Sequence, residues 1–128
     1  MHDRELTQTI IGAAIQVHKA LGPGLLESAY EVCLAAELST SRIAFEKQVP
    51  LPIQYRGQHL DCGYRLDLVV LDRVIVELKS VDQIAPIHRA QLLSYLRLSG
   101  KPIGLLVNFN VTRLTDGVTR LVHDYEQH

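Results

Sequence analysis

Two charged side chains interrupt one of the most apolar stretches of the chain, "RVIVELKSVD" at residues 73–82. Glu77 and Lys79 stand two residues apart among Val, Ile and Leu, so in a β-strand they would project from the same face. Moving a carboxylate out of water costs several kcal/mol unless a partner offsets its charge. The segment must therefore have partners for these charges nearby, or the end of the strand must be open to solvent.

A second carboxylate, Asp67, lies on the preceding predicted strand, ten positions before Glu77. If residues 71–73 form a three-residue loop, Asp67 stands opposite Glu77, whereas a two-residue loop turns it to the other face. The sequence leaves both registers open. In the first register, two carboxylates about 4 Å apart repel by roughly 4 kcal/mol at an effective dielectric of about 20. One of them then takes a proton, or a cation lies between them.

A hard divalent ion such as Mg²⁺ would suit this position, because it favours carboxylates, a backbone carbonyl and several water molecules. The carbonyl of Leu78 is well placed to be the backbone ligand. Lys79, held beside the ion, could orient a water nucleophile or stabilise a developing negative charge. The alternative interpretation is structural: Lys79 forms an ion pair with Glu77 or Asp67 at the rim of the sheet.

Other polar side chains recur at helical spacing. Gln91 and Tyr95 are four residues apart in "QLLSYL" and would share one helix face. Glu27 and Tyr30 are three apart in "GLLESAY", where a carboxylate gains from the helix dipole and the tyrosine fits a core residue with a hydrogen-bonded hydroxyl. His18, near the end of a predicted helix, fits the capping of carbonyl groups better than a metal or phosphate role.

The elements that must position these residues follow two periodicities. Helices are predicted where apolar residues recur at three- and four-residue spacing, and strands where β-branched runs are bounded by Gly, Pro or Asp. Pro50 and Pro52 should bend the first strand or place it at a sheet edge, and Gly57 marks a turn. The predicted elements are helix 5–21, helix 25–38, strand 44–55, a hairpin of strands 64–71 and 74–81, helix 86–99, strand 103–109, and a strand rather than a helix within 115–128.

This order predicts an α/β domain with a mixed sheet, and 128 residues suffice for a single domain. Thirteen Lys and Arg against fourteen Asp and Glu argue against gripping long nucleic acid by bulk charge alone, although a local basic patch is still compatible. The chain shows no signal peptide and no apolar run of about 20 residues, so we expect no membrane association. Cys33 and Cys62 match no metal spacing and fit reduced thiols in a cytoplasmic protein.

Taken together, these motifs resemble the small bacterial GxxExxY proteins. Gly24, Glu27 and Tyr30 fit the signature for which that family is named. The segments "VHKALGPG", "LDCGYRLDLVV", "VIVELKSV", "QLLSYL" and "GLLVNFNV" also look like that family, so the resemblance covers about residues 8–122. The family is placed in the PD-(D/E)XK nuclease superfamily. The resemblance therefore implies a restriction-endonuclease-like α-β-β-β-α-β core, with one mixed β-sheet flanked by helices in a single domain.

The resemblance also implies roles for individual residues. Asp67 corresponds to the strand aspartate of the superfamily, and residues 77–79 correspond to its E-x-K motif. The Q-x-x-x-Y element of the branch resembling the RecB nuclease domain is matched by Gln91 and Tyr95, and Glu27 matches the acid of the first core helix. One departure is Arg65, which stands where a proline is usual. The implied catalytic residues are Glu27, Asp67, Glu77, Lys79, Gln91 and Tyr95, and the implied metal ligands are Glu27, Asp67, Glu77 and the Leu78 carbonyl.

The activity implied by the resemblance is Mg²⁺- or Mn²⁺-dependent hydrolysis of phosphodiester bonds in nucleic acid, with DNA as the expected substrate. A nuclease this small would need a homodimer, a partner protein or a short structured substrate to hold nucleic acid. The alternative is a non-catalytic module that keeps the nuclease fold and binds nucleic acid or a partner. A purely structural interaction protein is a third interpretation, and it predicts no metal binding.

Overall fold

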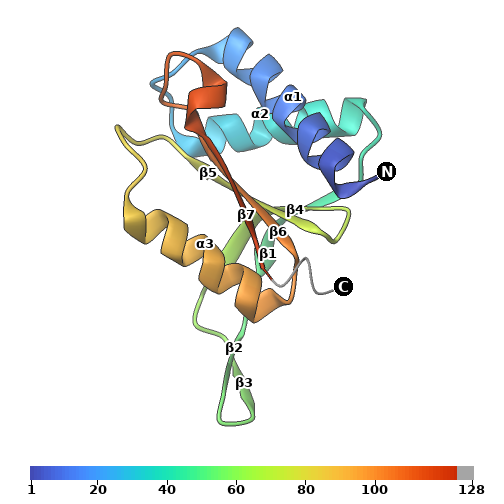
Figure 1. The fold of residues 1–128 in the computed structure, drawn as a ribbon, viewed down its shortest axis with the longest axis vertical. Helices are drawn as coiled ribbons and strands as arrows, with labels where there is room; N and C mark the ends of the chain where they lie inside the picture. Colours follow the sequence, from blue (N-terminus) through green and yellow to red (C-terminus); the bar gives the residue numbers. More distant parts are fainter. Residues whose placement is uncertain (124–128) are drawn as a thin grey trace.

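A five-stranded sheet runs through the middle of the protein, and helices cover both of its faces (Figure 1). The structure is a computed structural model in which residues 1–123 are described. It confirms the predicted α/β class with a mixed sheet. The elements are α1 (Asp3–Leu21), α2 (Glu27–Thr40), β1 (Phe45–Pro50), β2 (Ile53–Tyr55), β3 (Gln58–Leu60), β4 (Arg65–Val70), β5 (Val74–Lys79), α3 (Pro86–Ser99), β6 (Ile103–Asn108), the 3₁₀ helix η1 (Leu114–Gly117) and β7 (Val118–Val122).

The strand order in the large sheet is β1-β4-β5-β6-β7. All neighbouring strands are antiparallel except β5 and β6, which are parallel and are joined through α3. A parallel pair requires such a crossover, because a tight turn can only reverse the chain direction. The elements α2, β1, β4, β5, α3 and β6 form the expected α-β-β-β-α-β order, and the predicted last strand is β7. The end of that predicted segment, residues 124–128, lies outside the described residues.

Each face of the sheet has its own apolar core, because alternate side chains of a strand point to opposite faces. On one face, Val74, Val76 and Leu78 of β5 pack with α1 and α2. On the other face, Ile75 packs against Leu92 and Leu96 of α3. Glu77 belongs to the α3 face by this alternation, and its side chain is 7% exposed. A carboxylate is thus held almost completely within the protein, as the apolar context in the sequence predicted.

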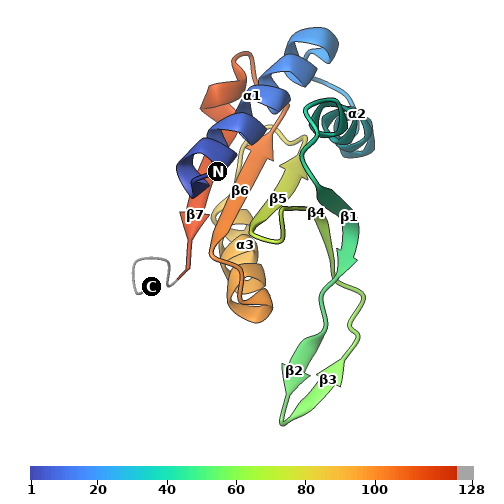
Figure 2. The same ribbon diagram turned by 90° about the vertical axis from the view of Figure 1, so that its right-hand side faces the viewer.

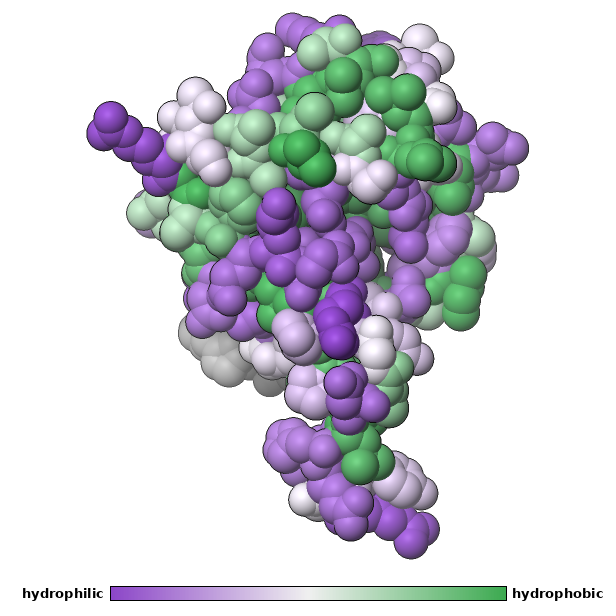
Figure 3. Space-filling view, turned by 180° about the vertical axis from the view of Figure 1, so that it is seen from behind, coloured by the Kyte–Doolittle hydropathy of each residue, from purple (hydrophilic) through white to green (hydrophobic). Residues whose placement is uncertain are grey.

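β2 and β3 form a separate two-stranded sheet, which we call the arm (residues 53–60). It projects away from the body of the protein (Figure 2), and its surface is mostly hydrophilic (Figure 3). Arg56 and Gly57, with φ of 50° and 80°, make the two-residue turn that such hairpins favour. The predicted interruption of the strand near Pro50 and Pro52 is confirmed, since the edge strand β1 ends there. The sequence interpretation recognised the turn at Gly57 but missed the independent hairpin.

The connection between α1 and α2 is fixed by Tyr30, which is fully buried. Its hydroxyl donates to the carbonyl of Gly22 at 2.6 Å and accepts from the backbone N–H of Leu25 at 3.1 Å. Its ring stacks on Phe109 with centroids 4.3 Å apart, so the predicted core role of Tyr30 is confirmed. The ring of His18 lies 2.8 Å, through Nε2, from the carbonyl oxygen of Val111. This histidine therefore contacts a carbonyl from a distant loop rather than one of its own helix.

None of the helices within residues 1–123 combines the length and the apolar character that crossing a membrane requires.

Candidate active site

The loop between β4 and β5 decides which way Asp67 faces. Pairing of Val70 with Val74 leaves residues 71–73 as a three-residue loop. The same register continues through the pair Leu68 and Val76, and its extension puts Asp67 opposite Glu77. Of the two registers that the sequence left open, the structure has the one that brings the two carboxylates to neighbouring positions. Leu71 and Asp72 adopt positive φ values of 51° and 56°, which this tight loop requires.

The two carboxylates replace backbone pairing at the point where β4 and β5 stop forming a regular ladder. The N–H of Asp67 donates to Oε2 of Glu77 at 2.8 Å. The N–H of Leu78 donates to Oδ2 of Asp67, also at 2.8 Å. Each side chain thus bonds to the backbone of the opposite strand. Among the described residues, only one oxygen of each carboxylate has a hydrogen-bond partner, which leaves Oδ1 and Oε1 available for a ligand.

A distortion in the edge strand β1 turns Asp67 toward α2. Gln48, which the register places opposite Asp67, has φ of 51° and drops out of the pairing between β1 and β4. The side chains of β4 change face here, since Leu68 packs in the α1–α2 core while Leu66 packs in the α3 core. An irregular position in a strand re-aims the side chain beside it. Asp67 therefore reaches a pocket instead of following strict alternation.

This pocket, which we call the α2 pocket, has a volume of about 180 Å³. Glu27, the first residue of α2, lies on its wall near Asp67, as the sequence predicted for the acid of the first helix. Glu31 is one helical turn further on and accepts a hydrogen bond from the amide of Gln48 at 2.6 Å. The sequence interpretation missed Glu31, although its spacing of four from Glu27 was the signal that could have found it. The pocket is lined by Glu27, Ser28, Glu31, Gln48, Asp67 and Leu78.

Burial and mutual repulsion disfavour the ionised form of both strand carboxyl groups. Burial, followed by the nearby charge of Asp67, raises the pKa of Glu77 to about 8. Burial is also the largest cause that raises the pKa of Asp67, and the carboxylates of Glu31 and Glu27 add to it, against the Leu78 N–H and the Lys79 ammonium. The site as it stands has more negative charge than its surroundings can stabilise.

Lys79 does not resolve this imbalance. Its charge lowers the pKa of both Asp67 and Glu77, so it lies near them. Yet within residues 1–123 its ammonium group forms no salt bridge and no hydrogen bond, and the residue is half-buried at the end of β5. The structural ion pair that the sequence offered as an alternative is therefore absent from the described part of the chain. The backbone behind Lys79 is held firmly, because its carbonyl accepts from Phe109 and the Asn108 side chain bonds both the N–H and the C=O of Val81.

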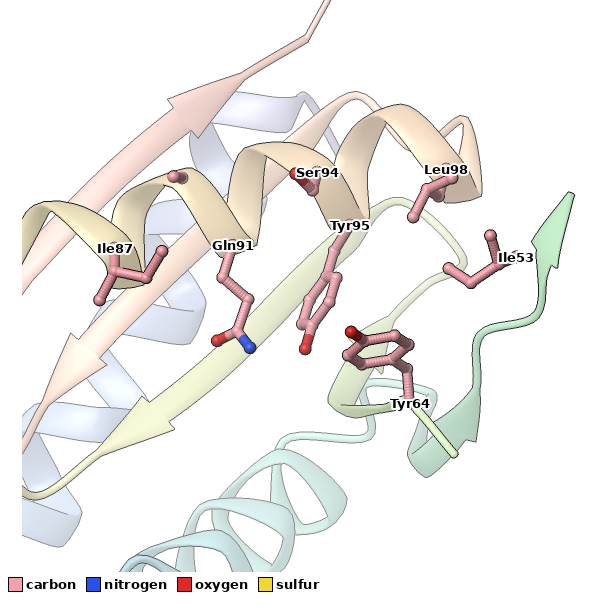
Figure 4. A pocket seen from close by; sticks show the side chains of 8 residues that line it. Ile53, Tyr64, Ile87, Gln91, Ser94, Tyr95 and Leu98 are labelled. Atoms are coloured by element: carbon pink, nitrogen blue, oxygen red, sulfur yellow. The ribbon is translucent and has the colours of Figure 1, made fainter. Parts of the chain in front are cut away.

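Gln91 and Tyr95 project from the same face of α3, as their spacing predicted (Figure 4). They line a second pocket, on the other side of the sheet edge from the α2 pocket, which we call the α3 pocket. The α3 pocket lies close to the carboxylate pair, because Tyr95 is affected by the charge of Glu77. Burial is the larger cause and this charge is the next one that raises the pKa of the Tyr95 hydroxyl, so the hydroxyl remains an O–H donor at neutral pH. The α3 pocket has a volume of about 310 Å³ and is lined by Ile53, Tyr64, Ile87, Ala90, Gln91, Ser94, Tyr95 and Leu98.

Tyr64 is a second residue that the sequence interpretation missed. It precedes β4, and its ring meets that of Tyr95 edge to face, with centroids 5.9 Å apart. No motif or spacing in the sequence singles it out. Arg65, Arg89 and Arg97 are all exposed at the surface.

The donor set suits a hard divalent cation in part. Asp67 and Glu77 offer two neighbouring carboxylates, each with an uncommitted oxygen, and neither forms a salt bridge to a described residue. Within the described residues, however, no three side chains of His, Cys, Asp or Glu converge closely enough to form a metal-binding group. Glu27 is thus a neighbour of the carboxylate pair and not a third member of a close cluster.

Comparison with models of protein families gives a match that spans nearly all of the described chain. A model of the PD-(D/E)XK nuclease superfamily matches residues 4–121. Neither the search of curated proteins nor that of solved structures gave a significant match. The matched range includes both pockets and every candidate residue named above. The chain belongs to the PD-(D/E)XK nuclease superfamily.

Proposed function

We propose that the protein is a nuclease that hydrolyses phosphodiester bonds of nucleic acid, with DNA as the expected substrate and Mg²⁺ or Mn²⁺ as the cofactor. Membership of the superfamily supports nuclease activity, and such nucleases generally use divalent metal ions. The observation that carries the proposal is the reciprocal bonding of Asp67 and Glu77 to opposite strands, which holds two carboxylates together beside an unpaired lysine. The match to Gly24, Glu27 and Tyr30 supports assignment to the GxxExxY group.

Four groups would hold the metal ion. Asp67 and Glu77 supply one free oxygen each, and Glu27 at the wall of the α2 pocket would act through a water molecule. The carbonyl of Leu78 is the fourth, because the N–H and C=O of one strand residue point to the same side, and its N–H points to Asp67. A bound divalent ion would activate water and stabilise charge on the phosphoryl oxygens. It would also neutralise the excess negative charge of this site.

Lys79 would act directly on the reacting groups. Its ammonium has no partner within the described residues, so it is free to orient the attacking water and to donate to a non-bridging phosphoryl oxygen. In the reaction, the water oxygen forms a bond to phosphorus while the bond to the leaving sugar oxygen breaks. The water gives up one proton to solvent and the leaving oxygen takes one up. Gln91 and Tyr95 would orient Lys79 or contact the substrate backbone from the α3 side.

The size and charge of the chain bear on how substrate is held. We propose that residues 1–128 act as a single nuclease-like domain, with a net charge of −1. That net charge argues against holding long duplexes by bulk charge alone. A homodimer, a partner protein or a short structured substrate would then supply the remaining grip.

The test is a cleavage assay on labelled single-stranded, duplex and branched DNA and on RNA, with Mg²⁺, Mn²⁺ or EDTA. Asp67→Asn keeps an acceptor for the Leu78 N–H but removes the charge, so it should abolish metal-dependent cleavage in a folded protein. Asp61→Asn, in the exposed loop before β4, is the matched control and should cleave normally. Lys79→Ala should also be inactive. Full activity of Asp67→Asn would overturn the assignment.

The second candidate is a non-catalytic module that binds nucleic acid or a partner. It is favoured by the low exposure of Glu77 and by the lack of a three-carboxylate cluster in the described residues. This candidate predicts binding that does not depend on metal and no cutting of any substrate. The same assay therefore decides between the two.

A further inference from the structure

The α3 pocket has a chemistry unlike that of the carboxylate site beside it. None of its lining residues, among those that the structure describes, is charged, whereas the α2 pocket contains Glu27, Glu31 and Asp67. Apolar side chains face solvent in it: Ile87 is 69% exposed and Tyr64 is 42% exposed. The polar groups among them are the Gln91 amide and the hydroxyls of Tyr64, Ser94 and Tyr95 (Figure 4). A neutral, flat guest with hydrogen-bonding edges fits such walls better than an ion does.

The position of the α3 pocket ties it to the proposed reaction centre. Tyr64 precedes Asp67 by three residues, a span of about 10 Å in extended chain, which is comparable with the distance from a phosphate to the far edge of its base. The carbonyl of Tyr64 accepts from the N–H of Leu51 at 3.0 Å, so the backbone that carries the ring is fixed. The ring of Tyr95 meets that of Tyr64 edge to face, and its hydroxyl lies close enough to Glu77 to be affected by the charge of that carboxylate. A phosphate at the carboxylates would place an adjacent base at this pocket.

We infer that the α3 pocket is a nucleobase subsite, in which the base next to the scissile phosphate packs on Tyr64, so that the substrate is single-stranded or unpaired at the point of cleavage. This inference rests on the proposed function and names its substrate class. A base within a duplex is stacked on both faces and paired along its edge, so it cannot meet a tyrosine ring without leaving the helix. Aromatic side chains beside a phosphate-binding site are how proteins hold unpaired strands without reading their sequence.

The chain provides a matched control for this subsite. Tyr55 is a second exposed tyrosine, 58% exposed, but it belongs to the arm and its ring lies under Arg56 instead of lining the α3 pocket. Tyr64→Ala removes the proposed stacking surface, Tyr55→Ala removes an equal ring elsewhere, and Tyr64→Phe keeps the ring while deleting the hydroxyl. Because Tyr64 is partly exposed, its truncation should leave the fold intact, which circular dichroism would check.

The experiment measures binding of a short fluorescein-labelled oligothymidylate by anisotropy, with Ca²⁺ present so that binding is followed without cleavage. We expect Tyr64→Ala to weaken binding about tenfold or more, while Tyr55→Ala and Tyr64→Phe stay within about twofold of the unaltered protein. On an abasic oligonucleotide of the same length, Tyr64→Ala should have no effect, because no base is left to stack. Fully paired duplex should bind more weakly than the single strand.

Any of three results would overturn the subsite. They are an equal loss of affinity in Tyr64→Ala and Tyr55→Ala, an equal effect of Tyr64→Ala on binding of the abasic strand, and binding of the duplex as tight as that of the single strand. The outcome is separable from that of the proposed function. If no metal supports cleavage but binding depends on Tyr64 and on the base, the nuclease assignment fails and the subsite stands. If cleavage occurs and is indifferent to Tyr64 and to base pairing, the subsite fails and the nuclease assignment stands.

Discussion

At the scale of residues, the site is defined by charges that lack compensation. Asp67 and Glu77 share a small space with Glu27 and Glu31 nearby, and Lys79 alone supplies positive charge without forming a salt bridge to any of them in the described chain. A buried carboxylate without a salt-bridge partner destabilises the fold, so stability alone does not explain this arrangement. Strongly perturbed acids in a concave site are typical of functional positions. Two predictions concern these residues.

The first prediction concerns stability and pH. Because the pKa of Glu77 is about 8 in the folded protein, above its ordinary value, the folded state holds a proton that the unfolded state releases. Stability without metal should therefore be greatest in mild acid, fall as the pH rises from about 4.5 to about 8, and then level off. Glu77→Gln cannot ionise and can still accept from Asp67, so most of this fall should disappear and the variant should be a few kcal/mol more stable at high pH.

Urea unfolding across this pH range measures the effect. Glu46→Gln, which removes an exposed carboxylate of the edge strand β1, is the control and should follow the unaltered protein. A decline in Glu77→Gln as steep as in the unaltered protein would mean that other groups cause it. The variant should nevertheless lose metal-dependent cleavage, so that it is more stable and less active.

The second prediction concerns metal binding. A divalent ion held by Glu77 must displace the proton that this carboxyl keeps below a pH of about 8. As the pH is raised toward that value, the affinity for Mn²⁺ should therefore increase by about tenfold per pH unit. Calorimetry in buffers of different ionisation enthalpy should show that about one proton is released on binding. Adding EDTA should reverse the gain in thermal stability that Mn²⁺ gives. Affinity that does not change with pH would remove Glu77 from the ligand set.

At the scale of elements, the site depends on irregularities that interrupt regular pairing. The three-residue loop sets the register of β4 and β5, and Gln48 turns Asp67 toward α2. The ends of β5 and β6 are joined by Asn108, whose side chain bonds the N–H and the C=O of Val81. Lys79 is thus the last strand residue before a segment that is held in place from the neighbouring strand. The packing behind this junction is correspondingly tight.

The third prediction tests that tightness. A Cβ at Gly117 would overlap the backbone oxygen of Asn108, and backbone cannot yield as a flexible side chain can. Gly117→Ala should destabilise the protein by about 1–3 kcal/mol and lower activity by shifting the strand that ends beside Lys79. The control is Gly12→Ala in α1, where nothing lies within 4 Å of the new methyl group, and it should stabilise by up to about 1 kcal/mol. Denaturant unfolding compares the two, and equal effects would contradict the prediction.

At the scale of the whole molecule, the protein consists of a sheet with two cores and an arm that shares neither. The arm residues 53–60 pair only with each other, and most of their side chains are exposed. A lone two-stranded hairpin contributes little stability of its own in water. Its inner end nevertheless supplies Ile53 to the wall of the α3 pocket.

The fourth prediction follows from this arrangement. Replacing residues 53–60 with a short Gly-Ser turn should leave a single cooperative unfolding transition with a midpoint within a few degrees of the original. The same deletion should weaken oligothymidylate binding, because the α3 pocket loses Ile53 from its wall. Loss of cooperative unfolding would show that the arm is part of the folding core. Scanning calorimetry and anisotropy provide the two measurements.

Much of the fold could be predicted from the chain because its signals are local. Apolar periodicity, together with Gly, Pro and Asp at the ends of segments, predicted the helices and most strands of the large sheet to within a few residues. The E-x-K spacing placed Glu77 and Lys79 on one strand face for the same reason, since alternation is a property of any extended backbone. The four-residue spacing of Gln91 and Tyr95 gave their shared helix face.

Tertiary structure alone decided what these residues meet. Whether Asp67 faces Glu77 depends on one residue of loop length, and its turn toward α2 depends on a backbone distortion at Gln48 in another strand. The contacts of Tyr64 with Tyr95, and of Glu31 with the same pocket as Asp67, join segments far apart in sequence. The sequence by itself thus determined the local elements and the chemical groups. The protonation states of these groups, their hydrogen-bond partners and the pockets that they line arise from long-range packing, which no local pattern encodes.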